Sequence, residues 1–443
     1  MKRNAKIGFV SLGCSKNLVD TERMLQLLSE AGYEITAEDI EADVIIVNTC
    51  AFIESAKKES IESILDVAWL KENRSLKGIV VTGCLAQRYG KDVLDQLSEV
   101  DAVLGVGSWD KIVEAVDAVL AGKTYFDRAD TDTAELSGGR ILTTPFYTAY
   151  MKIAEGCDNR CTYCAIPMIR GKFRSRPMDD LVREAKDLEN LGVKELTIVA
   201  QDTTRYGIDL YGEYKLPELL RRLAKETKIE WFRLLYCYPD KITDELIAEM
   251  RDNDRVVKYI DLPLQHISDK VLHRMNRRGD SKMIRDVIGK LRREIPGIVI
   301  RTTFIVGFPG ETEEDFEELC AFVDEAKFDR MGTFAYSREE GTPAYDFQDQ
   351  IDEQIKQDRA DIIMSQQYRI NAELNERFLH KTLKVLVEDY DVVAETYYGR
   401  SYMDAPEIDG KIYFSSKKKL KPGTFAQVKI DEIGDYDLLG HAL

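Results

Sequence analysis

Short apolar segments alternate with amphipathic helical segments through the first 125 residues of the chain. The segments KIGFVSLGC, VIIVNTC, GIVVTGC and AVLGV each precede a stretch with helical spacing of its apolar residues. Consecutive parallel strands need a crossover connection, usually a helix, so the alternation predicts a parallel α/β domain over residues 1–125. The carboxyl ends of its strands should open onto one edge, where ligands bind in such sheets.

Three of these predicted strands end at a cysteine. Cys14, Cys50 and Cys84 are far apart in the sequence, but all three are expected at the same edge of the sheet. Free cysteine is often a buried packing residue, yet three thiols at a ligand-binding edge favour a metal centre. Asn48 and Thr49 are predicted to cap the helix that follows Cys50, or to donate hydrogen bonds to a bound cluster.

The rest of the chain divides into three further segments. Residues 126–147 are polar and lack periodicity, which predicts a linker. Residues 148–372 repeat the strand–helix alternation six times, and this is typical of a partial (βα)6 TIM-like barrel with its chemistry at the strand carboxyl ends. Residues 376–443 contain short strands separated by glycines, which predicts a small all-β barrel that binds a partner.

Length and charge limit the class of protein. A chain of 443 residues is expected to form two or three domains. Its formal net charge of −17 favours a cationic or neutral macromolecular partner, or a small molecule, over bare nucleic acid. The sequence has no apolar run long enough to span a membrane and begins without an apolar signal segment, so we expect a cytoplasmic protein. Grouped cysteines in such a protein indicate metal binding or catalysis more than disulfides.

A second cysteine group follows the first predicted barrel strand. The segment GCDNRCTYCAIP places Cys157, Cys161 and Cys164 in a C-x3-C-x2-C pattern. Three thiolates on one loop can hold a [4Fe-4S] cluster and leave one iron open to substrate. Zinc is the weaker alternative, because its sites usually have a fourth Cys or His and no histidine occurs before residue 266.

This pattern in a six-fold βα barrel resembles the radical S-adenosylmethionine superfamily. The resemblance implies that S-adenosyl-L-methionine binds the open iron and is cleaved to a 5′-deoxyadenosyl radical. It places Gln201 and Asp202, in LTIVAQD, near the methionyl amine. It also places Gly307 and Gly310, in FIVGFPGET, where the backbone approaches the adenine closely, although a glycine at a strand end is often only part of a turn.

With the amino-terminal cysteines included, the whole chain resembles the methylthiotransferase family. The resemblance implies a second [4Fe-4S] cluster on Cys14, Cys50 and Cys84, and a TRAM-like fold for residues 376–443. It implies two uses of S-adenosylmethionine: one molecule methylates a sulfur held by the first cluster, and another gives the radical that removes a hydrogen atom from the substrate. It also implies a reductant protein such as flavodoxin or ferredoxin.

Local motifs separate the two branches of that family. The MiaB branch modifies adenosines of transfer RNA and typically has GCQMN and PYTRG-like motifs, where this chain has GCSKN and PMIRG. The RimO branch modifies the β-carbon of an aspartate in small-subunit ribosomal protein S-twelve, a basic protein that suits an acidic enzyme. Nucleic-acid contact would then be secondary. Four segments resemble the RimO branch: LGCSKNLVDTE, NTCAFIESAKKESI, CAIPMIRGKFRSRP and DLPLQHISDKVLHRMNR.

Several residues keep two interpretations. Four basic residues follow the second cysteine group: Arg170, Lys172, Arg174 and Arg176. They either bind a carboxylate of S-adenosylmethionine or substrate, or form a solvated charged run. His266 is at least as consistent with a structural role as with a catalytic one. An iron–sulfur carrier without enzymatic activity and an RNA-binding module remain as alternatives, but a carrier does not explain six barrel strands with S-adenosylmethionine-like motifs.

Overall fold

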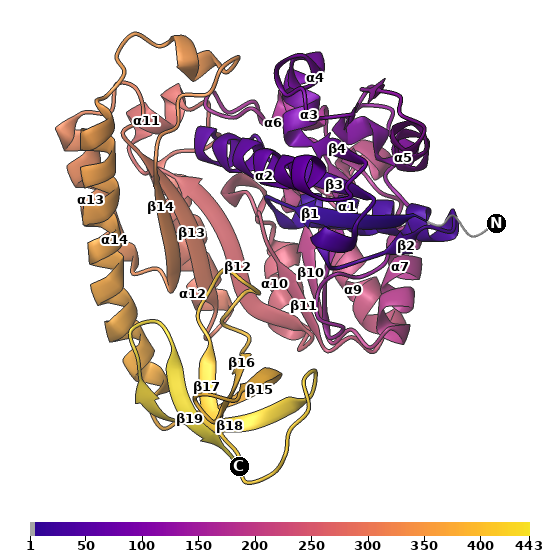
Figure 1. The fold of residues 1–443 in the computed structure, drawn as a ribbon. Coiled ribbons are helices and arrows are strands. Elements are labelled where there is room, and N and C mark those ends of the chain that lie inside the picture. The colour runs from indigo at the N-terminus through magenta and orange to yellow at the C-terminus, as the bar shows by residue number, and fades with distance from the viewer. Residues whose placement is uncertain (1–4) are drawn as a thin grey trace.

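The computed structural model describes residues 5–443, and its first part is a parallel sheet (Figure 1). The strand order is β2-β1-β3-β4-β5-β6, and every neighbouring pair is parallel. The strands are β1 (Lys6–Ser11), β2 (Glu34–Ile35), β3 (Val44–Thr49), β4 (Gly78–Gly83), β5 (Ala102–Leu104) and β6 (Tyr125–Asp127). The helices are α1 (Ser15–Glu30), α2 (Glu54–Asn73), α3 (Cys84–Tyr89), α4 (Lys91–Gln96) and α5 (Ile112–Leu120).

Helices cover both faces of this sheet, which explains why its central strands are continuously apolar. Val44 and Ile46 of β3 pack in one cluster with α1 and α5, whereas Ile45 and Val47 pack in another with α2, α3 and α4. All six residues of β3 and of β4 are buried. A strand covered on both sides has no solvent-facing positions, so it lacks the alternation of a half-exposed strand.

The segment predicted as a linker is more ordered than its composition indicates. Strand β6 ends at Asp127 and pairs with β5, so the first residues after position 125 extend the amino-terminal sheet. Farther along, the buried Glu22 carboxylate of α1 accepts a hydrogen bond from the Thr143 backbone N–H at 2.9 Å and forms an ion pair with Arg140 at 3.0 Å. Polar composition does not distinguish a free linker from one fixed by ion pairs.

The second part is an open, six-stranded parallel barrel. Its strands run in the order β14-β13-β12-β11-β10-β7 and pair in parallel, and β7 and β14 form its two edges. The strands are β7 (Thr148–Lys152), β10 (Glu195–Val199), β11 (Trp231–Leu234), β12 (Val256–Gln265), β13 (Val299–Val306) and β14 (Arg330–Ala335). A short antiparallel pair, β8 (Ala154–Glu155) and β9 (Arg174–Ser175), flanks the second cysteine group. The partial (βα)6 barrel predicted from the sequence is confirmed.

Helices pack on the outer face of this barrel and bury one continuous apolar core. They are α7 (Met178–Asn190), α8 (Ile208–Tyr211), α9 (Leu216–Glu226), α10 (Asp244–Asp252), α11 (Asp269–Arg274), α12 (Ser281–Glu294), α13 (Glu313–Ala326) and α14 (Glu353–Asn375). Helix α6 (Ile166–Arg170) instead packs against the amino-terminal domain through Ile169. In the described part of the chain, residues 5–443, none of the helices combines the length and hydropathy needed to cross a bilayer.

The third part is a closed barrel of five strands, in the order β15-β16-β17-β19-β18. They are β15 (Thr382–Asp391), β16 (Thr396–Arg400), β17 (Ile412–Ser415), β18 (Phe425–Ile433) and β19 (Leu438–Ala442). Glu195, the first residue of β10, is buried and receives hydrogen bonds from Arg233 at 2.7 Å and from Arg400 at 2.6 Å. The small barrel is therefore joined to the amino-terminal end of β10 by a buried ion-pair network.

Candidate metal centres

The structure brings Cys14, Cys50 and Cys84 to one edge of the amino-terminal sheet. Cys14 is the N-cap residue of α1, Cys50 directly follows β3, and Cys84 is the first residue of α3. Contacts join the three loops: a Cβ atom at Gly13 would lie 3.2 Å from Cys50 Sγ, and Asn17 Oδ1 lies 3.8 Å from Cys84 Sγ. Cys14 is partly exposed, whereas the other two are buried. We call these three residues the first triad.

Two glycines allow the loops of the first triad to approach one another. A Cβ atom at Gly13 would lie 2.9 Å from Cys50 Cβ and 3.2 Å from Cys50 Sγ. A Cβ atom at Gly83 would lie 2.5 Å from the Thr49 carbonyl oxygen. Both glycines also have φ near +90°, a conformation that other residues rarely adopt. Any side chain at either position would push the loops that carry the cysteines apart.

Asn17 connects the three loops of the first triad through both ends of its amide. Its Nδ2 donates to the carbonyl oxygens of Leu12, at 3.0 Å, and Thr49, at 2.8 Å. Its Oδ1 lies 3.8 Å from Cys84 Sγ and accepts a hydrogen bond from Arg170 at 2.6 Å. One buried side chain thus fixes the Cys14 loop, the end of β3 and the start of α3 relative to one another.

Arg170 brings a buried positive charge to the first triad, although it belongs to α6 of the barrel. Its guanidinium lies 3.6 Å from Cys84 Sγ and 3.1 Å from carboxylate oxygens of both Asp20 and Glu155. Lys152 forms ion pairs with the same two carboxylates. Burial opposes ionisation of Glu155, but Arg170 and Lys152 outweigh it and hold the pKa of that carboxyl well below its usual range. The result is a balanced buried group of two cations and two anions.

The thiols of the first triad differ in their electrostatic environment. Burial raises the pKa of the Cys50 thiol to about 12 and also raises that of Cys84. Burial acts in the same direction on Cys14, but the charges of Lys16 and Arg170, together with backbone N–H donors, lower its pKa below the ordinary value. Cys14 is therefore the member of the first triad that most readily becomes a thiolate.

The second triad, Cys157, Cys161 and Cys164, lies in one loop between β8 and α6. The Cys157 N–H donates to the Gly171 carbonyl at 3.1 Å, and the Cys164 N–H donates to the Cys161 carbonyl at 3.0 Å, so the loop folds back on itself. Burial raises the pKa of Cys157 to about 11 and raises that of Cys164 as well. Cys164 is partly exposed, while the other two are buried.

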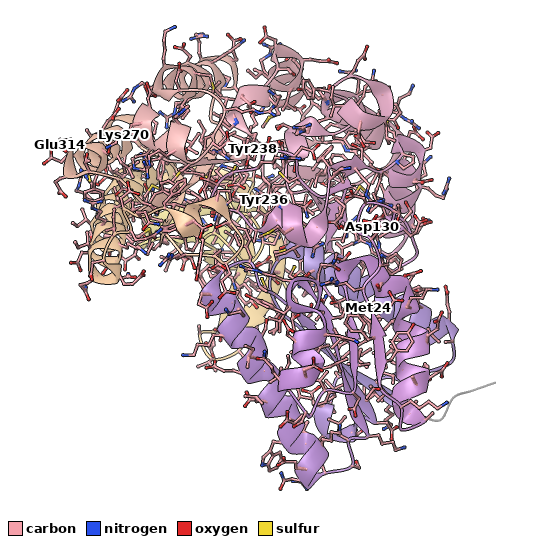
Figure 2. All side chains as sticks on the ribbon, turned by 90° about the horizontal axis from the view of Figure 1, so that it is seen from above. Met24, Asp130, Tyr236, Tyr238, Lys270 and Glu314 are labelled. Atoms are coloured by element: carbon pink, nitrogen blue, oxygen red, sulfur yellow. The ribbon has the colours of Figure 1, made fainter. Side chains whose placement is uncertain are left out.

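Residues 236–238, which follow β11, contact the surroundings of both triads. Lys16 Nζ lies 3.3 Å from the centroid of the Tyr236 ring, and Arg277 Cζ lies 4.1 Å from that of Tyr238. The Tyr238 hydroxyl is 3.3 Å from Cys161 Sγ, and Tyr236 has φ of 60°, unusual for a residue other than glycine. Figure 2 labels both tyrosines close to the boundary between the amino-terminal domain and the barrel. The two triads therefore share this short segment as a neighbour.

Gln201 and Asp202 lie at the carboxyl end of β10, as predicted, and both contact residues beside the second triad. Gln201 Nε2 donates to Glu155 at 2.7 Å, while its Oε1 is buried without a hydrogen-bond partner among residues 5–443. The Asp202 carboxylate accepts hydrogen bonds from Asn159 at 2.8 Å and Thr204 at 2.6 Å, and burial raises its pKa. Their predicted contact with the methionyl amine stays a prediction.

Gly307 and Gly310 follow β13, and neither faces open space. A Cβ atom at Gly307 would lie 2.3 Å from Lys356 Cγ, and one at Gly310 would lie 2.5 Å from Asp349 Oδ2. Both have positive φ, at 70° and 80°. A turn packed against α14 and the segment before it accounts for both glycines, and their approach to an adenine stays a prediction.

The interpretation of the arginines as a solvated charged run was wrong. Arg170 and Arg176 are fully buried, and Arg176 donates to the Lys152 carbonyl at 3.0 Å. Arg174 donates to the Ala134 carbonyl at 2.7 Å. His266 is also buried, with its Nδ1 accepting the Ser268 backbone N–H at 3.0 Å. Arg174, Arg176 and His266 thus have hydrogen-bond partners within the protein, and the contacts of Arg170 connect it with the first triad.

The capping roles predicted for Asn48 and Thr49 were also wrong. Helix α2 begins at Glu54, several residues beyond Cys50, and Ile53 is its N-cap residue. The side chain of Asn48 instead donates to the Asn17 carbonyl at 2.9 Å, and that of Thr49 donates to the Thr82 carbonyl at 2.5 Å. Both side chains hold the end of β3 in place, so they position Cys50 indirectly.

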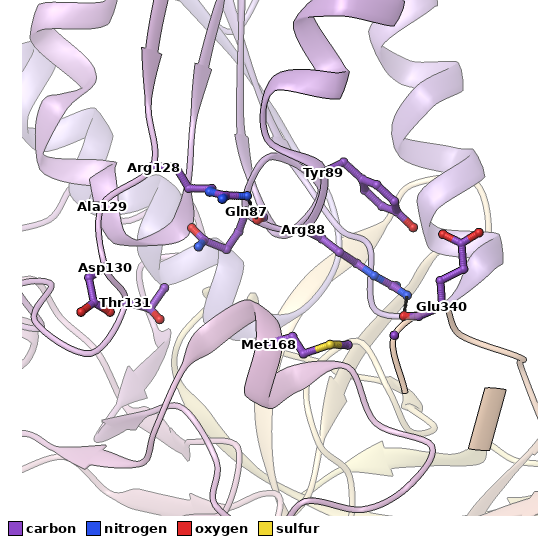
Figure 3. A pocket seen from close by; sticks show the side chains of 10 residues that line it. Gln87, Arg88, Tyr89, Arg128, Ala129, Asp130, Thr131, Met168 and Glu340 are labelled. Atoms are coloured by element: carbon purple, nitrogen blue, oxygen red, sulfur yellow. Dashed lines mark hydrogen bonds between the residues drawn. The ribbon is translucent and has the colours of Figure 1, made fainter. Parts of the chain in front are cut away.

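A pocket of about 620 Å³ opens between the elements that carry the two triads (Figure 3). Its wall combines Arg88 from α3, which begins with Cys84, and Met168 from α6, which follows Cys164. Arg88 also forms a buried ion pair with Glu339 at 2.8 Å. The remaining lining residues are Gln87, Tyr89, Arg128, Ala129, Asp130, Thr131, Glu340 and Gly341.

The two triads offer the donors that iron–sulfur clusters use. Each thiolate of a cubane binds a different iron, so three cysteines can hold a cluster and leave one iron open. Six thiols in two groups of three, with Arg170 and Arg277 beside Cys84 and Cys161, provide the soft donors and the positive charge that such clusters need.

Sequence reasoning missed the polar residues that support the triads. Asn17 lies within the motif GCSKN, but nothing in that motif indicates which loops its amide joins. Asp20, Lys152 and Glu155 come from two domains, so only the folded chain shows that they surround Arg170. The one available signal was indirect: Asp20 and Glu155 each lie close in sequence to a predicted cysteine ligand.

Three family models match consecutive parts of the chain. Residues 6–105 match the uncharacterized protein family UPF0004, residues 151–323 match the radical SAM superfamily, and residues 381–443 match the TRAM domain. The three matches cover most of the parallel sheet, most of the open barrel and the closed barrel, respectively.

The chain is similar over nearly its whole length to curated bacterial proteins. It is 50% identical to the ribosomal protein uS12 methylthiotransferase RimO of Thermoanaerobacter sp. (strain X514), over 98% of this chain and 99% of that protein. It is 52% identical to the protein of the same name from Desulforamulus reducens, over 98% of each chain.

Among solved structures, the radical S-adenosylmethionine methyltransferase TsrM of Kitasatospora setae, with cobalamin and a [4Fe-4S] cluster bound, has a similar fold. The TM-score is 0.55 at 15% identity, over 78% of this chain and 77% of that one. Such low identity supports the architecture alone. The level and the extent of the curated similarity, together with the radical SAM and TRAM matches, show that the chain belongs to the family of ribosomal protein uS12 methylthiotransferases, RimO.

Proposed function

We propose that this protein adds a methylthio group to the β-carbon of an aspartate in ribosomal protein uS12, the substrate in the name of its relatives. The observation that carries the proposal is the placement of two cysteine triads around one segment, residues 236–238. A reaction that needs both a sulfur centre and a radical source requires two such sites next to a common substrate.

Each triad would hold one [4Fe-4S] cluster, with three cysteine ligands and one open iron. When bound, the clusters and S-adenosyl-L-methionine supply a sulfur for methylation and a 5′-deoxyadenosyl radical. Arg170 and Arg277 donate toward the sulfurs of Cys84 and Cys161, and would stabilise negative charge there. Gln201 and Asp202 would bind the methionyl amine, for which the buried Gln201 Oε1 provides an acceptor.

The remaining partners follow from this chemistry. A reductant protein, such as flavodoxin or ferredoxin, would deliver the electron to the second triad's cluster. The protein would act in the cytoplasm, where its ribosomal substrate is made. The acidic chain, with a net charge of −17, would favour association with a basic ribosomal protein.

The test is product analysis with anaerobically reconstituted protein, S-adenosylmethionine and a reductant. Purified uS12 and transfer RNA are supplied in separate reactions, and both are analysed by mass spectrometry. We expect a methylthio group on an aspartate of uS12 and none on the RNA. Methylthio-adenosine in the RNA, with unmodified uS12, would support the MiaB-type activity instead. Absence of 5′-deoxyadenosine in every reaction would indicate an iron–sulfur carrier.

A further inference from the structure

Lys16 places a buried positive charge beside the first triad. The residue is only 6% exposed, and its Nζ lies over the ring of Tyr236, 3.3 Å from the centroid. Among residues 5–443, no carboxylate forms an ion pair with this ammonium group. Burial lowers its pKa, but the neighbouring Tyr236 and Cys14 raise it above the usual value. Buried charges in proteins are normally paired, because leaving one unpaired is costly.

Two neighbouring buried cations differ from Lys16, because they already have carboxylate partners. Lys152 and Arg170 are both paired with Asp20 and Glu155. Arg277 donates to the Pro263 carbonyl at 2.5 Å and to Cys161 Sγ at 3.8 Å. The Tyr236 ring stabilises the Lys16 ammonium by a cation–π contact but supplies no carboxylate.

The position of Lys16 connects the charge with the reacting centres. Lys16 is two residues from Cys14 of the first triad. Tyr236, its neighbour across the domain boundary, is two residues from Tyr238, whose hydroxyl lies 3.3 Å from Cys161 of the second triad. An anion bound to Lys16 would therefore lie beside residues 236–238, the segment that also contacts the second triad.

We propose that the Lys16 ammonium, held against Tyr236, is the binding site for the side-chain carboxylate of the substrate aspartate. In aspartate the carboxylate carbon is bonded directly to the β-carbon, so anchoring the carboxylate also fixes the carbon that reacts. An ammonium is a strong partner for a carboxylate and a weak one for the amide of asparagine, which has the same shape. This assignment rests on the proposed function, since it specifies the substrate group that the same site would hold.

The experiment measures binding of two peptides to anaerobically reconstituted full-length protein by calorimetry. One is a uS12 peptide with its target aspartate, and the other has asparagine at that position. We expect the wild-type protein to bind the aspartate peptide about 10- to 100-fold more tightly than the asparagine peptide. In Lys16→Met the two peptides should bind equally weakly, as expected when a pairwise interaction is removed.

The matched control is Lys71→Met, which removes a lysine of the same domain that is already paired with Asp101 at 2.7 Å. It should keep the preference for aspartate. Iron and sulfide content, and 5′-deoxyadenosine formation without peptide, should be the same in the wild type and both variants. These readouts separate substrate binding from assembly of the clusters.

A Lys16→Met variant that still prefers the aspartate peptide would overturn the assignment. Weaker binding of S-adenosylmethionine in the absence of peptide would also overturn it, because the carboxylate at Lys16 would then be the methionyl one. If Lys16→Met loses iron, Lys16→Gln is tested in its place. Loss of iron from both variants would also overturn the assignment, because Lys16 would then support the cluster. Failure of the proposed function is distinguishable: wild-type protein would then leave the aspartate peptide unmodified.

Discussion

The two triads are built in opposite ways. The first takes one cysteine from each of three strand ends, and the second takes all three from a single loop of eight residues. The geometry of the first therefore depends on the register of β1, β3 and β4 and on close packing at Gly13 and Gly83. The second needs mainly its own loop. A long-range site of this kind forms only when the sheet is complete, whereas a local one is largely set by its sequence.

The supporting charges show that the two triads are nevertheless coupled. Arg170 belongs to α6, six residues after Cys164 of the second triad, yet its guanidinium lies beside Cys84 of the first. Its counter-ions come from both sides, Asp20 from α1 and Glu155 from β8. The loop of the second triad thus helps to position a charge that the first triad uses, so a change at one site can reach the other.

The largest effect is expected from Cys14→Ala and Cys157→Ala, which test whether the triads are separate. Each variant should keep about half of the iron and sulfide, because three-cysteine sites do not retain a cluster with two ligands. Both should lose methylthio transfer completely. Cys157→Ala should also lose 5′-deoxyadenosine formation, which Cys14→Ala should retain. Anaerobic iron and sulfide determination and product analysis measure these outcomes.

Cys320→Ala is the control for the cysteine variants. Cys320 is a partly exposed residue of α13 and belongs to neither triad, so the iron content should not change. If Cys14→Ala and Cys157→Ala lost the same iron, or all of it, the division into two independent sites would be wrong.

The next largest effect concerns the coupling through Arg170. In Arg170→Met, two buried carboxylates would share Lys152 alone, and breaking a buried ion pair in this way costs about 3–5 kcal/mol. We expect the free energy of unfolding to fall by that amount in urea denaturation, and iron to be lost mainly from the first triad. Retention of the second triad's iron in this variant would show that Arg170 supports the first triad and not the second.

Lys172→Met provides the matched control, since it removes a positive charge two residues away. The Lys172 side chain is 77% exposed and forms a surface ion pair with Asp132. Its loss should change the free energy of unfolding by no more than about 0.5 kcal/mol. Equal destabilisation by the two substitutions would contradict the role assigned to the buried network.

The cysteine positions and the barrel could be predicted because local patterns determine them. Apolar runs that end at Cys14, Cys50 and Cys84 define strands, and parallel strands bring their carboxyl ends to one edge. Strand β6 was missed because its three residues, Tyr125–Asp127, carry too little pattern to separate them from a polar segment. Its place in the sheet comes from pairing with β5.

The polar surroundings of the triads could not be predicted, because their partners are distant in sequence. The sequence places Asn48 and Thr49 before a helix, where capping is the ordinary expectation. In the fold, their side chains bond to Asn17 and Thr82 on neighbouring elements. Arg170 likewise has a solvated appearance in the sequence, and only its contacts with Asp20 and Glu155 show that it is buried.

The smallest expected effect distinguishes the two tyrosines between the triads. Tyr238→Phe removes a hydroxyl 3.3 Å from Cys161 Sγ, and hydrogen bonds to cluster sulfurs stabilise the reduced, more negative state. A bond of about 1 kcal/mol corresponds to about 40 mV for a one-electron couple, so the potential of the second cluster should fall by that amount. Tyr236→Phe keeps the ring against Lys16 and should leave this potential unchanged. Redox titration followed by electron paramagnetic resonance measures the potential of the second cluster in both variants. If the two substitutions shifted this potential equally, residues 236–238 would not separate the two clusters electrostatically.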